Sequence, residues 1–193
     1  HLLGPQKIQR QRLRRARSRL EGDALGSDVC GAACSPEALE LAKLAQAATG
    51  LAPSTARDVR LLIDGAAKYD ALIEDIACAR HHVHLEYYIF TPDRSGTALR
   101  DALAACAGRG VRVRLLLDAI GSGKCSRGFL APLIDAGAEL AWFHPTRFWK
   151  FWSRPWLNMR THRKIVVIDN RIAYTGGINI TDDENERLRS DAY

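Results

Sequence analysis

The sequence predicts an α/β domain, an α/β/α sandwich in which helices cover both faces of a mixed, largely parallel sheet. Segments with strand-like patterns alternate along the chain with segments whose apolar residues recur at helical spacing. Apolar residues make up 47% and charged residues 26% of the 193 residues, which is the balance of a folded domain with a core. Parallel strands need helical crossovers, so the alternation favours this fold.

The first half of the chain should contain two helices and two strands. Ser35 can cap a helix that has Pro36 in its first turn and ends at Gly50. Residues 59–63 form a short apolar run followed by the turn signal Asp64-Gly65, which predicts a strand. Apolar residues at helical spacing follow over 67–80, and residues 82–90 are rich in β-branched and aromatic types typical of a strand.

The second half continues the alternation and ends in a hairpin. The predicted elements are a helix over 97–107, a strand over 111–117, a helix over 129–136, a strand over 138–143, and two strands over 164–168 and 172–174. Asp169-Asn170-Arg171 separates the last two strands and predicts a tight turn. This hairpin should add antiparallel pairing, which makes the sheet mixed.

Positive charge is concentrated at the start of the chain. Residues 1–20 contain seven basic and no acidic side chains, whereas residues 21–193 contain 21 basic and 22 acidic ones. We interpret residues 1–27 as a basic juxtamembrane or linker segment that binds anionic lipid headgroups. A solvated arm, or one that touches nucleic acid, remains an alternative. The near-neutral remainder counts against a nuclease, so no nucleic-acid partner is expected.

Four residues near the C-terminus have the chemistry for phosphoryl transfer. A neutral histidine such as His162 can attack phosphorus, and Lys164, two residues further on, should point to the same face of a strand. Its ammonium can hold phosphate oxygens, and Asn179 and the backbone at Gly177 can donate hydrogen bonds to them. A histidine before a strand is usually only a polar residue, but the joint spacing predicts a phosphate site. No carboxylate cluster suggests a metal, and no cofactor is expected.

The spacing carries a family resemblance. The run His162-x-Lys164-x4-Asp169-x6-Gly176-Gly177-x-Asn179 resembles the signature of the phospholipase D superfamily, and its double glycine resembles the cardiolipin synthases. The runs 84–90 and 110–114, and Asp118 with Gly121-Ser122, resemble that family in order and spacing. The resemblance covers about residues 58–185.

The resemblance implies a reaction and roles for residues. His162 would attack phosphatidylglycerol and form a phosphohistidine, Lys164 and Asn179 would bind the phosphate, and a second histidine would transfer protons. The products would be cardiolipin and glycerol. Asp169 belongs to the catalytic motif, but strand geometry places it on the opposite face from His162, so a role in the turn is equally open. Glu86 is expected behind the site on the neighbouring strand.

The resemblance also implies a missing partner. Superfamily members pair two such motifs across one site, and this sequence contains one. We expect residues 28–193 to form a first phospholipase D-like domain, truncated at its C-terminus. A second half, in the same full-length chain or in a homodimer, would complete it, and the fragment alone should be inactive. The acid that orients the nucleophilic histidine is expected beyond Tyr193.

An aromatic, basic stretch leads into His162. Trp149, Trp152 and Trp156, together with Arg154, suit a membrane interface. A plug packed on the second half, or a base-stacking groove, would use the same residues. The expected location is the cytoplasmic side of a bacterial inner membrane. The alternatives to a transferase are a homodimeric phosphodiesterase or nuclease, and a non-catalytic membrane-binding half-domain.

Overall fold

The computed structural model describes residues 35–50, 56–143 and 160–189. The chain divides into two compact units, His1–Arg60 and Leu61–Tyr193. Among the described residues, no helix has the length and apolarity that a membrane crossing requires. The basic segment 1–27 lies outside the described residues, as do Trp149, Trp152, Arg154 and Trp156.

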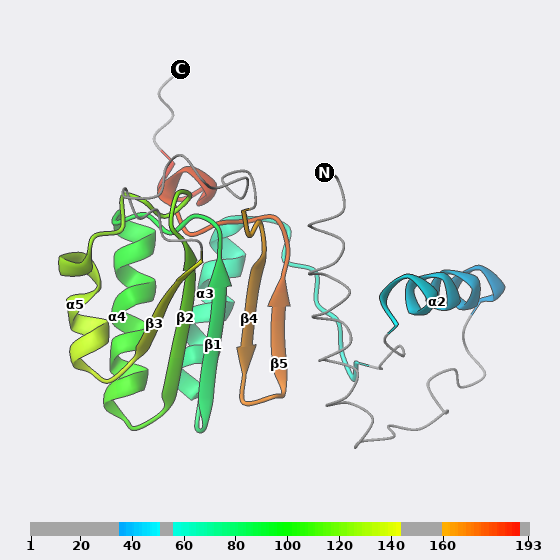
Figure 1. Cartoon of the computed structure of the whole chain (residues 1–193), viewed down its shortest axis with the longest axis horizontal. Coiled ribbons are helices and arrows are strands. Elements are labelled where there is room, and N and C mark those ends of the chain that lie inside the picture. The colour runs from blue at the N-terminus through cyan, green and yellow to red at the C-terminus, as the bar shows by residue number, and fades with distance from the viewer. Residues whose placement is uncertain (1–34, 51–55, 144–159, 190–193) are drawn as a thin grey trace, which may run out of the picture. The chain divides into compact units, whose positions relative to one another are not determined.

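Helix α2 (Pro36–Thr49) is the regular element described in the first unit (Figure 1). The Ser35 hydroxyl accepts a hydrogen bond from the backbone N–H of Ala38 (3.3 Å), and Gly50 ends the helix with a φ of 73°. Both ends agree with the predicted capping signals. None of its residues is buried, and Leu41 and Leu44 are 67% and 69% exposed.

The strand predicted over residues 59–63 is wrong. These residues form no regular element and pair with no strand in the described part of the chain, and Val59, Leu61 and Ile63 are more than four-fifths exposed. Asp64 does not close a strand. Its side chain instead accepts the N–H of Ala67 (2.7 Å) and begins helix α3 (Gly65–Cys78). A short apolar run without a neighbouring strand leaves its backbone groups to water.

The second unit is built on one five-stranded sheet. Its strands are β1 (His82–Tyr87), β2 (Arg112–Asp118), β3 (Glu139–Phe143), β4 (Lys164–Ile168) and β5 (Ile172–Thr175), in the order β3-β2-β1-β4-β5. The pairs β1–β2 and β2–β3 are parallel, whereas β1–β4 and β4–β5 are antiparallel. The predicted mixed sheet is therefore confirmed, but it is not largely parallel, since two of its four pairings are parallel and two are antiparallel.

The hairpin between β4 and β5 forms as the sequence predicts. Asp169 and Asn170 have φ values of 53° and 54°, and the N–H of Arg171 bonds the carbonyl of Ile168 (2.9 Å). The register pairs Ile168 with Ile172, so the loop consists of residues 169–171. Positive φ at its first two residues is a geometry that Asp and Asn tolerate.

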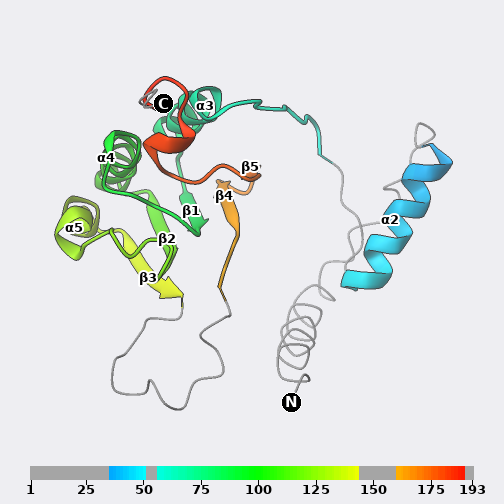
Figure 2. The same cartoon turned by 90° about the horizontal axis from the view of Figure 1, so that it is seen from above.

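Helices α3, α4 (Arg94–Gly108) and α5 (Arg127–Asp135) lie together on one face of the sheet (Figure 2). The core forms between them and the inward-facing strand positions. It includes fully buried side chains from each layer: Leu72, Ile76, Val83, Leu99, Leu103, Leu117 and Leu130. This arrangement confirms the α/β class. The second helical layer predicted for an α/β/α sandwich is not found among the described residues of this unit, whose helices lie on this one face.

Candidate active site

The candidate site lies at the edge where β1, β2 and β3 end and β4 begins (Figure 1). Parallel strands bring their carboxyl ends to one edge. The antiparallel register of β4 places Lys164 opposite Tyr87, the last residue of β1. Residues 160–163, which precede β4, therefore meet the loops that follow β1 and β2.

His162 and Lys164 are in direct contact. The Lys164 Nζ lies 3.0 Å from His162 Nδ1 and 3.1 Å from the His162 carbonyl oxygen. His162 is exposed, whereas Lys164 is 6% exposed. Burial lowers the pKa of Lys164, and the nearby carboxylate of Glu184 acts in the opposite direction. The structure thus places an accessible imidazole beside a largely buried amine, although the strand begins only at Lys164.

Tyr88 packs against the histidine. The ring centroids of Tyr88 and His162 are 4.4 Å apart with a tilt of 36°, and Lys164 Nζ lies 5.4 Å from the Tyr88 ring. Sequence reasoning missed this residue, because one tyrosine in an aromatic strand carries no signal of its own. Its position restricts the orientation of the His162 ring.

Asp118, the last residue of β2, forms hydrogen bonds with the segment that precedes His162. Its fully buried carboxylate accepts the N–H of Thr161 through Oδ2 (3.2 Å). Through Oδ1 it accepts the N–H groups of Ile120 (2.9 Å) and Gly121 (3.0 Å). The buried acceptor thus joins two loops that contribute to the site.

Glu86 contacts both neighbours of His162. Its Oε1 accepts the Thr161 hydroxyl (2.5 Å) and lies 3.4 Å from the Arg163 guanidinium. Glu86 therefore contacts the side chains on either side of the histidine, which is consistent with its predicted position behind the site.

Asn179 is brought to the same edge and held in one orientation. It is 6% exposed, its Nδ2 donates to Glu184 Oε1 (2.7 Å), and its backbone N–H donates to Glu184 Oε2 (2.5 Å). The backbone N–H of Ile89 donates to Asn179 Oδ1 (3.3 Å). A carboxylate only accepts and a backbone N–H only donates, so these contacts define which end of the amide is which. One of the two Nδ2 hydrogens remains for another acceptor.

The backbone carbonyl of Asn179 accepts hydrogen bonds from two side chains of helix α3. Lys68 Nζ (3.1 Å) and the Tyr69 hydroxyl (2.7 Å) both donate to it. Lys68 is 7% exposed, and burial lowers its pKa to about 7. Sequence reasoning missed Lys68. Its place four residues before Leu72, on the buried stripe of α3, was the available signal.

The two adjacent glycines of the motif are exposed and have free space around them. Gly176 and Gly177 are exposed, and a side chain at either position would meet no atom within 4 Å. Neither has a positive φ. Local packing therefore gives no reason for glycine here, and the contact of the Gly177 backbone with phosphate stays a prediction.

Comparison with known proteins gives the family. The family model described as "Cardiolipin synthase, PLD-like domain" matches residues 72–190. This chain belongs to that family. The match spans every residue of the site except Lys68 and Tyr69.

Curated relatives agree with the assignment. A cardiolipin synthase of Geobacillus sp. (strain WCH70) is 43% identical over 140 residues, which are 72% of this chain and 27% of that protein. Cardiolipin synthase 1 of Bacillus anthracis is 41% identical over 124 residues, which are 64% of this chain and 24% of that protein. This chain spans about a quarter of the length of these relatives.

The solved structure of NucT from Helicobacter pylori also aligns with this chain. It covers 60% of this chain and 68% of its own, at 21% identity and a TM-score of 0.45.

In this phospholipase D-like domain Asp169 lies at the opposite end of β4 from Lys164. Its carboxylate accepts backbone N–H groups of Arg80 (2.9 Å), His81 (2.8 Å) and His82 (2.9 Å). These hydrogen bonds lower the pKa of Asp169 to about 2. The carboxylate thus joins the hairpin turn to the start of β1, and the geometry does not support the catalytic role expected for it.

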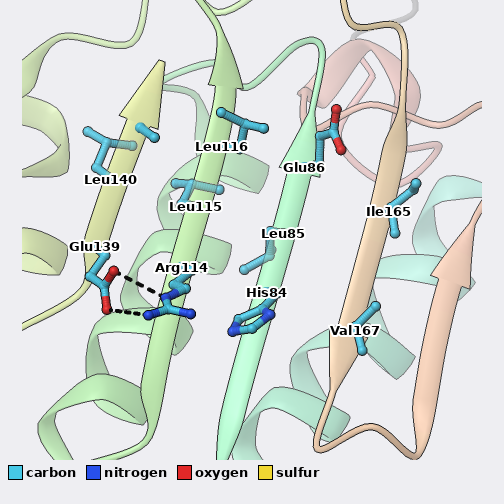
Figure 3. Close-up of a pocket in the computed structure, with 11 residues that line it drawn as sticks. His84, Leu85, Glu86, Arg114, Leu115, Leu116, Glu139, Leu140, Ile165 and Val167 are labelled. Carbon is cyan, nitrogen blue, oxygen red and sulfur yellow. Dashed lines mark hydrogen bonds and ion pairs between the residues drawn. The ribbon is translucent and has the colours of Figure 1, made fainter. Parts of the chain in front are cut away.

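A hollow of about 470 Å³ lies on the sheet face opposite the helices (Figure 3). Its lining includes His84, Glu86, Leu116, Ile165 and Val167, and a salt bridge joins Arg114 to Glu139 (3.1 Å). His162, Lys164 and Asn179 do not line it. The hollow is therefore distinct from the candidate site around His162, Lys164 and Asn179.

Proposed function

We propose that this chain is the first catalytic half of a bacterial cardiolipin synthase that transfers a phosphatidyl group from one phosphatidylglycerol to another. The observation that carries the proposal is the contact between exposed His162 and Lys164 (3.0 Å). Asn179, held by Glu184, supplies a donor for phosphate at the same edge. The family membership favours a phospholipid as the phosphodiester.

The proposed reaction has two displacements. A His162 ring nitrogen attacks phosphorus, an N–P bond forms, and the bond from phosphorus to the glycerol oxygen breaks. A histidine of the second motif gives its proton to that oxygen and then takes one from the hydroxyl of a second phosphatidylglycerol. This hydroxyl attacks the phosphohistidine, which yields cardiolipin and regenerates His162. Lys164, Asn179 and the Gly177 N–H hold the phosphate oxygens.

The His162 tautomer has to change during this reaction if Nε2 is the nucleophile. An ammonium only donates, so its contact with Nδ1 puts the proton of the neutral ring on Nε2. Attack through Nε2 requires that proton to move to Nδ1. Lys164 would then turn from the ring to the arriving phosphate, where its charge is better placed.

A second half and a lipid surface complete the proposal. The second motif comes from the same full-length chain or from a homodimer, and residues 28–193 form the first domain. The basic segment 1–27 and the side chains of Trp149, Trp152, Trp156 and Arg154 contact anionic lipid at the cytoplasmic face of the inner membrane. The concentration of positive charge in residues 1–20 supports this placement.

The decisive experiment measures lipid products. The protein expressed from its complete open reading frame should convert labelled phosphatidylglycerol in liposomes to cardiolipin. Replacing His162 with Ala should reduce the rate at least about 1,000-fold, because loss of a covalent nucleophile removes the reaction path. Phosphate label on the protein, stable in alkali and labile in acid, should disappear in the same variant.

Two other outcomes would contradict the proposal. Phosphatidic acid as the product would identify water as the acceptor and a hydrolase. An active His162→Ala variant would exclude a phosphohistidine intermediate at His162.

A further inference from the structure

Glu184 is the carboxylate around which the phosphate-binding side of the site is arranged. Its two oxygens accept both the backbone N–H and the Nδ2 of Asn179, at 2.5 and 2.7 Å. It lies in the 3₁₀ turn η2 (Asp182–Glu184), five residues after the amide that it binds. No sequence motif pointed to it.

We propose that Glu184 is a positioning residue for phosphate binding: it directs the remaining Nδ2 hydrogen of Asn179 toward the substrate and balances the charge of Lys164. This inference rests on the proposed function, because it names how that site is held in its binding geometry.

A carboxylate is the group that this geometry requires. Both Asn179 groups facing Glu184 donate, and a carboxylate offers two acceptor oxygens without a donor. A glutamine would keep one acceptor and turn an NH₂ group toward a second donor. The Asn179 amide could not compensate by flipping, because its Oδ1 accepts the N–H of Ile89 (3.3 Å).

The backbone of Glu184 is itself fixed. Its N–H donates to the carbonyl of Thr181 (3.3 Å), and its own carbonyl lies against Gly65 at the start of α3. A Cβ at Gly65 would be 1.7 Å from that carbonyl oxygen, so the approach depends on glycine. The carboxylate is therefore presented from a rigid support, as precise positioning demands.

The charge of Glu184 acts on Lys164 as well. Within the described part of the chain, the titratable side chains near Lys164 are His162 on its own segment, Tyr88 after β1, and Glu184 on η2. Glu184 also raises the pKa of Lys68 on α3. Burial lowers the pKa of Lys164 and Glu184 raises it. Neutralising Glu184 should lower that pKa further, so that Lys164 loses its proton at a lower pH.

The test compares Glu184→Gln with Glu186→Gln in the full-length protein. Glu186 is a matched control two residues away: it accepts the N–H of Ala66 at the start of α3 (3.1 Å) and does not contact Asn179. Glu184→Gln should lower kcat/KM for phosphatidylglycerol by about 10- to 100-fold. A misdirected Asn179 Nδ2 donor should stabilise the transition state less, but its loss should be smaller than that of removing the donor altogether. It should also move the alkaline limb of the pH profile to lower pH, and Glu186→Gln should change neither.

Two results in an active wild type would overturn the inference. One is an unchanged kcat/KM and alkaline limb in Glu184→Gln. The other is an equal loss in Glu186→Gln, which would indicate that both acids only support the fold. Either result leaves the proposed function standing.

A wild type without lipid transfer would overturn the proposed function, and inorganic phosphate then tests Glu184 separately. Phosphate should shift the Asn179 side-chain amide signals in the NMR spectrum of the ¹⁵N-labelled wild type and not in Glu184→Gln. Equal shifts in both proteins, or no shift in either, would overturn the inference.

Discussion

Single carboxylates in this domain hold backbone N–H groups that are far away in the sequence. Asp118 binds the N–H of Thr161, Asp169 binds those of residues 80–82, and Asp182 binds that of Ser95. Hydrogen bonds to a charged acceptor are stronger than neutral ones, so one side chain can fix a loop. Asp118 acts in this way at the edge that carries the candidate site, whereas Asp169 acts at the opposite end of β4.

Asp169→Asn should lower the free energy of unfolding by about 1–2 kcal/mol at pH 7, since charge-assisted bonds to a partly exposed group are weakened. The folded-state pKa of Asp169, about 2, lies below the ordinary value. Its contribution is therefore present above about pH 4 and is lost as the pH falls toward 2. Urea unfolding of both proteins at pH 7 and pH 3 measures the difference, which should shrink at pH 3.

The control for this prediction is Asp183→Asn, which removes an exposed acid. It should leave the free energy of unfolding almost unchanged at both values of pH. A difference between wild type and Asp169→Asn that stays constant from pH 7 to pH 3 would contradict the pKa argument.

At the scale of elements, the loop after β2 supports the end of β1. The Ser122 hydroxyl donates to the carbonyl of Tyr88 (2.9 Å) and accepts the N–H of Phe90 (3.0 Å). Gly121 lies directly against Tyr88, where a Cβ would be 2.3 Å from the Tyr88 carbonyl oxygen and 2.8 Å from its ring. Because the Tyr88 ring packs on His162, this loop acts on His162 through one side chain.

Gly121→Ala should destabilise the protein by about 1–3 kcal/mol, because the added methyl group collides with backbone that cannot move freely. It should also lower the rate of phosphatidyl transfer by displacing Tyr88 from His162. Gly108→Ala is the control: a Cβ there meets no atom within 4 Å, and alanine favours the helix α4. Thermal unfolding and the lipid assay measure both effects, and full activity in Gly121→Ala would contradict the link to His162.

At the scale of the whole molecule, the charge separates into a basic tail and a near-neutral remainder. The formal net charge is +6, and residues 1–20 carry seven basic and no acidic side chains. Each cation near an anionic lipid surface contributes about 1 kcal/mol, so this segment alone could hold the protein on such a surface. We therefore expect lipid binding to be separable from the reaction.

Replacing the seven basic residues of the tail with Gln should weaken binding to vesicles that contain phosphatidylglycerol at least about 100-fold in 0.1 M salt. Binding of the wild type should itself fall as the salt concentration is raised, because salt screens the attraction between the basic side chains and the anionic lipid. Vesicle sedimentation measures both. Vesicles of neutral lipid are the control, and equal binding to the two lipids would contradict the electrostatic role.

The sequence predicted most helices and strands because their signals are local. Ser35 and Gly50 mark the ends of α2, and positive-φ residues mark the β4–β5 turn. The prediction over residues 59–63 failed because an apolar run becomes a strand only beside another strand, and local pattern cannot show that neighbour. Motif spacing likewise identified His162, Lys164 and Asn179, which the structure brings to one edge, but it could not separate Asp169 from them.

The sequence by itself determined the α/β class and the family, and it predicted which side chains react, because periodicity, capping and motif spacing act within a few residues. Only the tertiary structure decided how those side chains are held. Lys68 reaches the carbonyl of Asn179 across 111 positions of the chain, and Gly121 meets Tyr88 only because β1 and β2 end side by side. Such contacts depend on the order and register of the strands. The packing of the whole domain sets that order and register, and a local sequence pattern does not contain them.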